Sequence, residues 1–494
     1  MLTGVLQTCT TAASRAAASA ASSMLALLAT AAALHASSAV SVPWPRSMVR
    51  TAVPRATSDS STATITADAH ERWMLYALEL AERGRLSTAP NPWVGCVIVA
   101  ADGATVLAEG YHQRKGGPHA EAAALADAKA RGVSRAAMEG ATAYVTLEPC
   151  TMGPGKSTPA CDAALVASGL RNVHLALLDP DPTFGGGADF LRANGIAVTV
   201  GAGAAAVLAS LRPYLYQRRT GKPWVVLKVA SSADGAIACA DGGTPLERSA
   251  HASSSPHTAP SSRYTGTSQW ITGERARAHS QVLRASSQAI MVGSGTAVAD
   301  KPKLTVRLAD GALPDGWLPP SNPLLRVVLD ASGRVTDGPL LDTSAAPTLV
   351  FTTAAAAGEA RDAWRAAGVE AVEVPPAGPS GGVDLEAVLI ELGSRGVIQL
   401  MVEGGGQLHG AFLAERRAQQ FRLYVGACAL GSSAQRWMQA PLAATIEEAQ
   451  RWRLSGVEVL GDDVCVDYDV DDGDGVGGEE SAAAGEGRSC SCCD

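Results

Sequence analysis

Three short segments of this 494-residue chain carry metal-binding side chains, and only a fold that brings the three together could use them. Pro118-His119-Ala120-Glu121 opens a predicted helix, Glu148-Pro149-Cys150 follows a predicted strand, and Cys161 opens the next helix. One imidazole and two thiolates can hold zinc and leave a fourth position for water. Glu121 shares a helical turn with His119, so it could move protons beside that water without binding the metal. The alternative is that both cysteines are ordinary buried residues and that His119 caps a helix.

The elements around these segments alternate between strand and helix. Apolar residues recur at helical spacing over 70–81, and short continuous apolar runs mark strands. The pattern predicts strands at 94–100, 105–108, 141–147 and 173–178, and further helices at 120–130 and 161–168. This order is typical of an α/β/α layered unit.

The order of the ligands narrows the chemistry. His-x-Glu followed by Pro-Cys is the pattern of zinc deaminases. Their general signature has two residues between the cysteines, whereas ten intervene here, from Thr151 to Ala160.

A second α/β unit begins near a strand at 225–230 and ends at a strand around 464–468. A helical connector at 201–216 precedes it, and a stretch rich in Ser, Pro and Thr at 241–265 predicts a flexible surface insertion. We therefore expect a disordered transit peptide at 1–66, a zinc deaminase domain with its connector at 67–216, a second enzymatic domain at 217–468 and an acidic disordered tail at 469–494.

Four runs carry a resemblance to a known family. The runs at 90–99, 109–112, 118–121 and 143–150 read PNPWVGCVIV, EGYH, PHAE and AYVTLEPC. They resemble the bifunctional riboflavin-biosynthesis deaminase–reductases, and the likeness covers about 68–468. It implies that zinc binds His119, Cys150 and Cys161, that Glu121 is the proton donor, and that Asn91 and His112 help to hold the substrate. In that family the spacing between the cysteines is itself long.

One departure from the family lies beside the zinc ligands. The family typically continues Ser-His-His-Gly-Arg-Thr after the first cysteine, whereas this chain continues Thr151-Met152-Gly153-Pro154. Met152 replaces a substrate-facing histidine and cannot supply its hydrogen bond. The loop is also about two residues longer than usual, so the deaminase activity depends on what replaces that contact.

The resemblance extends to the second domain, which looks like dihydrofolate reductase and is expected to bind NADPH. Glycine-rich turns follow predicted strands at 293–295 and 404–406, where backbone N–H groups could approach a phosphate. Neither turn matches the Rossmann fingerprint, which disfavours an ordinary Rossmann domain. The likeness implies that the sugar-phosphate substrate contacts Ser268, Arg284, Leu304, Arg307 and Glu403, and Lys228 lies near a strand end of the same site. It implies that the NADPH site is lined by Ala230, Trp270, Thr296, Asp300, Gly405, Gly406, Gln407, Leu408, His409, Gly410 and Ala411.

This half also departs from the family. The usual Asp-Asp-Pro is Asp300-Lys301-Pro302, and the basic group of Lys301 could lie near a cofactor phosphate. For Trp270 the alternative is plain core packing.

Charge and composition exclude several other classes of protein. The formal net charge of −8 comes from 462–494, which holds 11 acidic residues and one arginine, so the rest of the chain is nearly neutral. Such a body argues against a nucleic-acid partner, because phosphate binding needs clustered Lys and Arg. The longest early apolar run, 24–34, is too short to span a bilayer. The ten cysteines are scattered, as in a reducing compartment.

The first 58 residues contain no Asp or Glu, are rich in Ala and Ser, and carry four arginines. This composition predicts a transit peptide to the plastid, with the mitochondrion as the alternative and secretion less favoured.

These observations predict zinc-dependent deamination of a diamino-ribosylamino-pyrimidinone 5′-phosphate, followed by NADPH-dependent reduction of its ribosyl group. The first alternative is a reductase with an inactive deaminase domain. The others are a deaminase that edits nucleic acid and a binding protein without turnover. Like its relatives, the protein is expected to form homo-oligomers.

Overall fold

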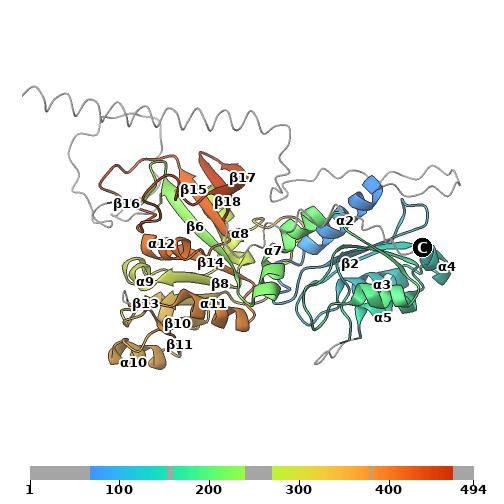
Figure 1. Ribbon diagram of the computed structural model, residues 1–494, viewed down its shortest axis with the longest axis horizontal. Helices are drawn as coiled ribbons and strands as arrows, with labels where there is room; N and C mark the ends of the chain where they lie inside the picture. Colours follow the sequence, from blue (N-terminus) through green and yellow to red (C-terminus); the bar gives the residue numbers. More distant parts are fainter. Residues whose placement is uncertain (1–66, 153–158, 240–269, 379–380, 471–494) are drawn as a thin grey trace, which may run out of the picture. The chain divides into compact units, whose positions relative to one another are not determined.

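The computed structural model describes residues 67–152, 159–239, 270–378 and 381–470, which contain two large β-sheets in separate stretches of the chain (Figure 1). The predicted transit peptide, the predicted insertion at 241–265 and nearly all of the predicted tail lie outside the described residues. Within the described ranges, no helix is long and apolar enough to cross a membrane.

The first sheet has five strands in the order β2-β1-β3-β4-β5. Strand β1 is antiparallel to both of its neighbours, while β3, β4 and β5 are parallel. The strands are β1 Gly95–Val99, β2 Val106–Tyr111, β3 Thr142–Leu147, β4 Asn172–Leu177 and β5 Ala197–Val200. The helices are α2 Ala67–Glu82, α3 Ala120–Ala130, α4 Arg135–Glu139, α5 Cys161–Ser168, α6 Gly187–Ala193 and α7 Ala204–Thr220.

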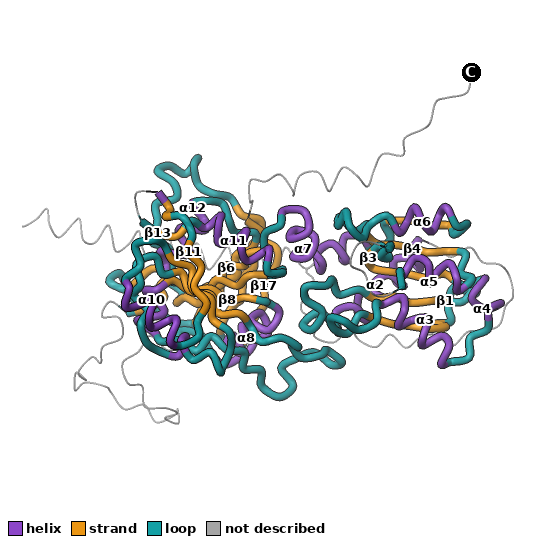
Figure 2. The backbone as a smooth tube through the Cα atoms, turned by 90° about the horizontal axis from the view of Figure 1, so that it is seen from below, coloured by secondary structure: helices purple, strands orange, loops and turns teal. Residues whose placement is uncertain are grey.

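Helices cover both faces of this sheet (Figure 2). Met74 of α2 and Leu211 of α7 share one buried cluster with Val97, and Ala124 of α3 and Leu165 of α5 share the other with Ile98. Val97 and Ile98 are neighbours in β1, so the alternation of side chains along a strand supplies both faces. The predicted α/β/α unit is confirmed.

The second sheet has nine strands in the order β11-β10-β9-β8-β14-β6-β15-β18-β17. The pairs from β11 to β15 are parallel, and the hairpin of β17 and β18 adds to β15 antiparallel. The strands are β6 Trp224–Ser232, β8 Ala289–Gly293, β9 Leu325–Leu329, β10 Thr348–Thr352, β11 Glu370–Glu373, β14 Gln399–Gly404, β15 Gln420–Gly426, β17 Trp452–Leu460 and β18 Asp463–Val470. Two small sheets pair β7 Ala236–Ala238 with β16 Gln435–Arg436, and β12 Pro376–Ala377 with β13 Gly382–Val383.

The helices of this half also lie on both faces of their sheet. They are α8 Glu274–Ser286, α9 Ser294–Asp300, α10 Gly358–Ala366, α11 Leu385–Ser394 and α12 Gly406–Ala414, with a 3₁₀ turn at Pro339–Leu341. Val388 of α11 and Phe412 of α12 belong to one buried cluster, while Leu283 of α8 and Trp364 of α10 belong to another. The parallel strands direct their carboxyl ends to one edge of the sheet, which is where sites form in such folds.

Two predicted boundaries need correction. The strand expected at 105–108 runs over Val106–Tyr111, because β2 pairs with β1 along that whole length. The tail was expected to begin at 469, yet β18 continues to Val470. Asp469 pairs with Arg453 of β17 and Val470 is buried, so both residues belong to the sheet.

Candidate active sites

His119, Cys150 and Cys161 meet at one point in the first half of the chain. Nδ1 of His119 lies 3.4 Å from Sγ of Cys150 and 3.5 Å from Sγ of Cys161. All three ligand atoms lie within 4.8 Å of one another. Tetrahedral zinc with nitrogen and sulfur ligands holds such atoms about 3.6 Å apart. The donor set and its spacing therefore fit zinc.

Each ligand is placed by the start of a helix or the end of a strand. His119 is the N-cap residue of α3, Cys150 follows β3, and Cys161 is the first residue of α5. The carbonyl oxygen of Cys150 accepts hydrogen bonds from the amides of Cys161, at 3.2 Å, and Asp162, at 3.4 Å. The N-terminus of α5 therefore lies beside both sulfurs, and its partial positive charge favours the thiolate forms that bind metal.

The loop that carries Cys150 is held by Glu148. Its carboxylate, which is buried, accepts from the amides of Asp179 at 3.0 Å and Ala188 at 2.8 Å. A Cβ on Gly187 would lie 2.0 Å from the carbonyl oxygen of Pro149, so only glycine allows this approach. The Glu-Pro-Cys motif thus carries a positioning carboxylate beside the ligand.

Glu121 lies in the first turn of α3 and is 3% exposed. Burial raises the pKa of its carboxyl group, and the neighbouring Cys150 thiol raises it further, while His119 and a hydrogen bond with Cys161 lower it. The carboxyl group is therefore next to the zinc ligands, as the predicted proton donor requires.

Asn91 and His112 form the adjacent wall. Nε2 of His112 lies 3.1 Å from Nδ2 of Asn91, and Nδ1 of His112 lies 2.9 Å from the carbonyl oxygen of Pro118. Since a carbonyl oxygen only accepts and an amide nitrogen only donates, His112 is neutral with its proton on Nδ1. Burial also lowers the pKa of His112. Asn91 thereby keeps its carbonyl oxygen for another partner.

Met152, the departure from the family pattern, is 65% exposed. The rest of its loop, 153–158, lies outside the described residues.

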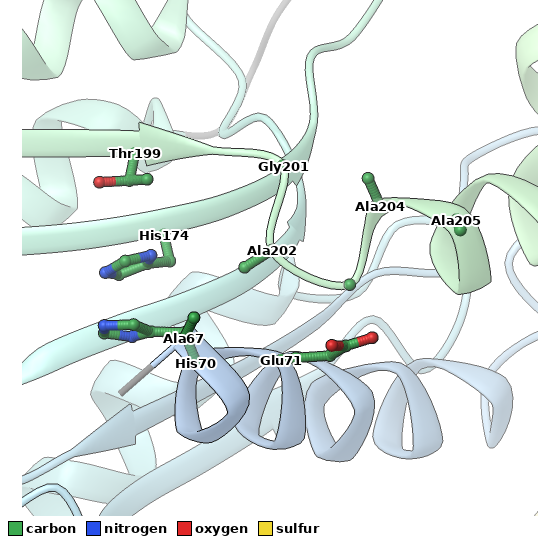
Figure 3. A pocket seen from close by; sticks show the side chains of 10 residues that line it. Ala67, His70, Glu71, His174, Thr199, Gly201, Ala202, Ala204 and Ala205 are labelled. Carbon is green, nitrogen blue, oxygen red and sulfur yellow. The ribbon is translucent and has the colours of Figure 1, made fainter. Parts of the chain in front are cut away.

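A separate pocket in this half is lined by His70, His174 and Thr199, together with 201–203 and the first residues of α7 (Figure 3). None of the zinc ligands lines it. The imidazoles of His70 and His174 stack with their centroids 4.0 Å apart, and Nδ1 of His70 lies 2.9 Å from the hydroxyl of Tyr144. Parallel rings direct their lone pairs side by side and not at a shared point, so this pair does not resemble a metal site.

In the second half, an ion pair marks the edge formed by the carboxyl ends of β6 and β14. Arg284 of α8 binds Glu403 of β14 through two nitrogens, with distances of 2.7, 2.7 and 3.1 Å, and donates to the carbonyl oxygen of Thr305 at 2.8 Å. Arg284 and, less strongly, Lys228 lower the pKa of Glu403, although burial raises it. Three predicted substrate residues therefore meet, but the forked guanidinium of Arg284 is occupied by a carboxylate.

Leu304 and Arg307 lie on the segment after α9. Leu304 is buried and has a φ of 49°, a left-handed conformation that is uncommon for a leucine. Arg307 is exposed, its amide donates to Oε1 of Gln281 at 2.8 Å, and its charge lowers the pKa of Glu403. Of the two arginines, Arg307 has the side chain available for a substrate phosphate.

The predicted cofactor turn coincides with the first turns of α12. Gly405 is its N-cap residue and its amide donates to Oγ1 of Thr296 at 3.1 Å. A Cβ on Gly406 would lie 2.8 Å from Cγ of Gln439, and Nδ1 of the buried His409 has no hydrogen-bond partner among the described residues. The amides of the first turn after Gly405 lie at a helix N-terminus, where the helix dipole favours a dinucleotide phosphate. Gln407, Leu408, Gly410 and Ala411 continue this helix.

The other predicted cofactor residues lie on β6, at the end of α9 and before α8. Ala230 lies on β6, Asp300 ends α9, and burial raises the pKa of Asp300. Trp270 is 54% exposed, so plain core packing does not describe it, and the guanidinium of Arg277 lies 4.3 Å from its ring centroid. Ser268 lies outside the described residues.

Lys301 binds a protein carboxylate. Its Nζ lies 2.8 Å from Oδ2 of Asp337, and both side chains are exposed. An aspartate at this position, as in the usual family sequence, would face Asp337 with like charge. The ion pair explains how a lysine is accommodated there.

Sequence reasoning missed the side chains behind Lys228. Tyr424 of β15 and His279 of α8 are joined by a hydrogen bond of 2.9 Å, and Nζ of Lys228 lies 5.8 Å from the Tyr424 ring centroid. The two residues are 145 positions apart in the sequence, so no local spacing pattern predicts their contact. The only sequence signal is a tyrosine on a buried strand next to the strand of Lys228.

Comparisons with known proteins agree with this geometry. Residues 67–177 match the cytidine and deoxycytidylate deaminase zinc-binding region, and 260–466 match the RibD C-terminal domain. The riboflavin biosynthesis protein RibD of Chlamydia trachomatis is 39% identical over 79% of this chain and 93% of its own, and that of Escherichia coli is 35% identical over 80% and 98%.

Solved structures similar to this chain belong to the same family. Acinetobacter baumannii RibD has a TM-score of 0.66 at 32% identity and covers 82% of this chain and 99% of its own. A diaminohydroxyphosphoribosylaminopyrimidine deaminase/5-amino-6-(5-phosphoribosylamino)uracil reductase from Thermotoga maritima has a TM-score of 0.64 at 27% identity over 82% and 99%. The predicted combination of a cytidine-deaminase-like domain and a dihydrofolate-reductase-like domain is confirmed. The chain belongs to the RibD family of riboflavin biosynthesis and is a bifunctional enzyme with a zinc-binding deaminase domain and an NADPH-dependent reductase domain.

Proposed function

We propose that the chain deaminates 2,5-diamino-6-ribosylamino-4(3H)-pyrimidinone 5′-phosphate and then reduces the ribosyl group of the product to ribityl. The observation that carries the first step is the meeting of His119, Cys150 and Cys161 beside the buried Glu121. The Thermotoga maritima relative, named for both reactions, supports this choice of substrate.

In the deaminase site, zinc would be held by His119, Cys150 and Cys161, and it supplies the Lewis acidity that makes water a nucleophile at neutral pH. Glu121 moves one proton from the attacking water to the ring nitrogen next to the reacting carbon, and then moves the remaining hydroxyl proton to the amine, so that ammonia departs as the carbonyl forms. Asn91 holds a polar edge of the pyrimidine with its free carbonyl oxygen, because its Nδ2 already donates to His112. Glu148 keeps Cys150 in place through its two backbone contacts.

In the reductase site, NADPH supplies the hydride to the ribosyl carbon. The bond from that carbon to the ring oxygen breaks, and the oxygen takes up a proton. Arg307 binds the 5′-phosphate, whereas Arg284 fixes the carboxylate of Glu403 beside Lys228. The first turns of α12 would hold a cofactor phosphate through their amides.

A reductase with an inactive deaminase domain is the second candidate, because Met152 offers no hydrogen bond where relatives carry a histidine. Retention of the three ligands and Glu121 favours the bifunctional protein.

Ammonia release separates the two candidates. The zinc-loaded chain should release ammonia from the diamino substrate without NADPH, and Glu121→Gln should lower that rate by about 100-fold or more while zinc content stays the same. Glu139→Gln, at an exposed position on α4, is the matched control and should keep the wild-type rate. A folded, zinc-containing wild-type protein that releases no ammonia but reduces the deaminated substrate would make the second candidate correct.

We also propose that residues 1–66 direct the protein to the plastid. Their lack of acidic residues over the first 58 positions and their Ser- and Arg-containing composition support this. A fusion of residues 1–66 to a fluorescent protein should coincide with chlorophyll fluorescence. Coincidence with a mitochondrial dye would assign the alternative organelle, and a secreted or cytosolic signal would contradict a transit peptide.

A further inference from the structure

Behind the reductase site lies a row of three polar side chains that the reaction described above does not use. Nε2 of His279 lies 3.4 Å from Oε2 of Glu458, and Nδ1 of His279 lies 2.9 Å from the hydroxyl of Tyr424. Glu458 lies on β17, His279 on α8 and Tyr424 on β15, so three elements contribute one residue each. The row of side chains runs from the half-exposed Glu458 to Tyr424, which is 1% exposed.

The tautomer of His279 follows from the charge of Glu458. Nε2 lies within ion-pair distance of this carboxylate without a hydrogen bond to it, and the negative charge favours the neutral imidazole tautomer whose proton is on Nε2. Nδ1 of a neutral imidazole is then a lone pair, and the Tyr424 hydroxyl donates to it. Donation of this kind raises the electron density of the phenol ring, because hydrogen bonds in a chain polarise one another.

Lys228 lies against this ring. Its Nζ is 5.8 Å from the Tyr424 ring centroid, within the range in which the negative face of an aromatic ring attracts a cation. Burial lowers the pKa of Lys228, Arg284 lowers it too, and Glu403 and Cys465 oppose them. An electron-rich ring acts in the same direction as Glu403, because it favours the ammonium over the neutral amine.

We propose that His279 is a positioning residue of the reductase, which acts through Tyr424 to hold the Lys228 ammonium beside Glu403. The proposal rests on the reductase activity and on a substrate that binds beside Lys228. Reduction breaks a carbon–oxygen bond and places the electron pair on the ring oxygen, so a cation kept at this edge of the sheet stabilises the charge that develops.

Other charged groups face the same cluster. Cys465 of β18 contacts Tyr424, and Arg422 forms an ion pair with Asp467 on the neighbouring strands at 2.5 Å. These groups influence the pKa of Tyr424, which burial raises most. The Tyr424 hydroxyl is hydrogen-bonded to Nδ1 of His279 and also to the Cys465 thiol, so replacement of His279 leaves Cys465 as its partner.

The test is the pH profile of NADPH oxidation by the full chain with the deaminated substrate. His279→Ala should lower kcat several-fold at pH 8. It should also move the alkaline limb of the kcat profile to lower pH by about half a unit to one unit, because the Lys228 ammonium loses part of its stabilisation. KM for the substrate and the rate of ammonia release should stay unchanged. His279→Asn, whose carbonyl oxygen can accept from Tyr424, should recover most of the wild-type profile.

Tyr424→Phe separates this proposal from a structural role, because it keeps the ring and loses only the hydroxyl. It should shift the profile in the same direction as His279→Ala. Arg275→Ala, at an exposed position on α8, is the control and should behave as wild type. Should His279→Ala fail to fold, Tyr424→Phe alone decides. A wild-type profile for Tyr424→Phe, or a loss in His279→Ala confined to melting temperature, would overturn the proposal, whereas a wild-type chain that oxidises no NADPH would contradict the reductase function itself.

Discussion

His174 is an imidazole without a role in the zinc chemistry, and its surroundings make it sensitive to acid. Its ring stacks on that of His70 between β4 and α2 (Figure 3), and its Nδ1 is buried with no hydrogen-bond partner in the described part of the chain. Burial, and then the neighbouring His70, lower the pKa of His174 to about 4.

The sign of the effect on stability follows from linkage. The unfolded chain binds a proton at His174 near pH 6.5, whereas the folded chain binds it only near pH 4, so stability falls as the pH drops through this interval. His174→Val should therefore lose less melting temperature between pH 7.5 and pH 5 than the wild type. The wild type should lose more stability than His174→Val over this pH interval. After allowance for solvent screening of this half-buried ring, the expected difference is about 1 kcal/mol in the free energy of unfolding, or about 2–4 °C in melting temperature.

Melting curves at the two pH values check this. Thr199→Val, in the same pocket but without a titratable group, is the control and should keep the wild-type difference. An equal loss of melting temperature in His174→Val and the wild type would contradict the assignment.

The residues of the two sites differ in how far sequence could find them. His119, Glu121, Cys150 and Cys161 could be predicted because metal chemistry demands few side-chain types and because helix and strand ends place them. Two ion pairs could not be predicted from the sequence. Glu403 binds the guanidinium of Arg284 from 119 positions away, and Asp337 binds Lys301 from 36 positions away. Only folding brings such pairs together.

At the scale of elements, the zinc site depends on how closely α3 lies on β2. A Cβ on Gly110 of β2 would lie 2.3 Å from the amide nitrogen of Ala124 and 2.7 Å from the carbonyl oxygen of Ala120, both in the backbone of α3. Backbone cannot yield as a flexible side chain can, so Gly110→Ala must push α3 away from the sheet. His119, the N-cap residue of that helix, moves with it.

Gly110→Ala should therefore lower zinc occupancy and ammonia release together, and should destabilise the fold by about 2 kcal/mol or more, in the range of overpacked cores. NADPH oxidation should remain. Gly358→Ala, at the start of α10 with no atom within 4 Å of its added Cβ, should be neutral. Full zinc occupancy in Gly110→Ala, measured by metal analysis, would show that α3 is not fixed by this contact.

The spacing of apolar residues predicted the helix bounds well where a motif residue marks the start of the helix. The helices at 120–130 and 161–168 coincide with α3 and α5, because His119 and Cys161 mark where each begins. The connector was expected at 201–216 but α7 occupies Ala204–Thr220, since Gly203 and Gly221, both left-handed, bound it. Strand β2 also exceeded its apolar run, because pairing with β1 holds polar residues such as Glu109 in the strand. Local composition thus underestimates elements whose ends are held by backbone pairing.

At the scale of the whole molecule, the two activities draw on different stretches of the chain. The zinc ligands and Glu121 lie between 119 and 161, whereas the described substrate and cofactor residues of the reductase lie between 228 and 411. Each set is assembled on its own sheet, and the buried cluster under α3 and α5 shares no residue with the buried cluster under α12. One site can therefore lose its chemistry while the other keeps its geometry.

Removal of zinc by a chelator should abolish ammonia release and leave NADPH oxidation with the deaminated substrate within about two-fold of its original rate. The deaminase cannot activate water without its metal, while the Arg284–Glu403 pair and the first turns of α12 contain none of the zinc ligands. Added Zn²⁺ should restore ammonia release and Mg²⁺ should not, because two thiolates and an imidazole suit zinc and not a hard cation. A parallel loss of both activities would mean that zinc supports the fold of the entire chain, as metals do where binding and folding are coupled.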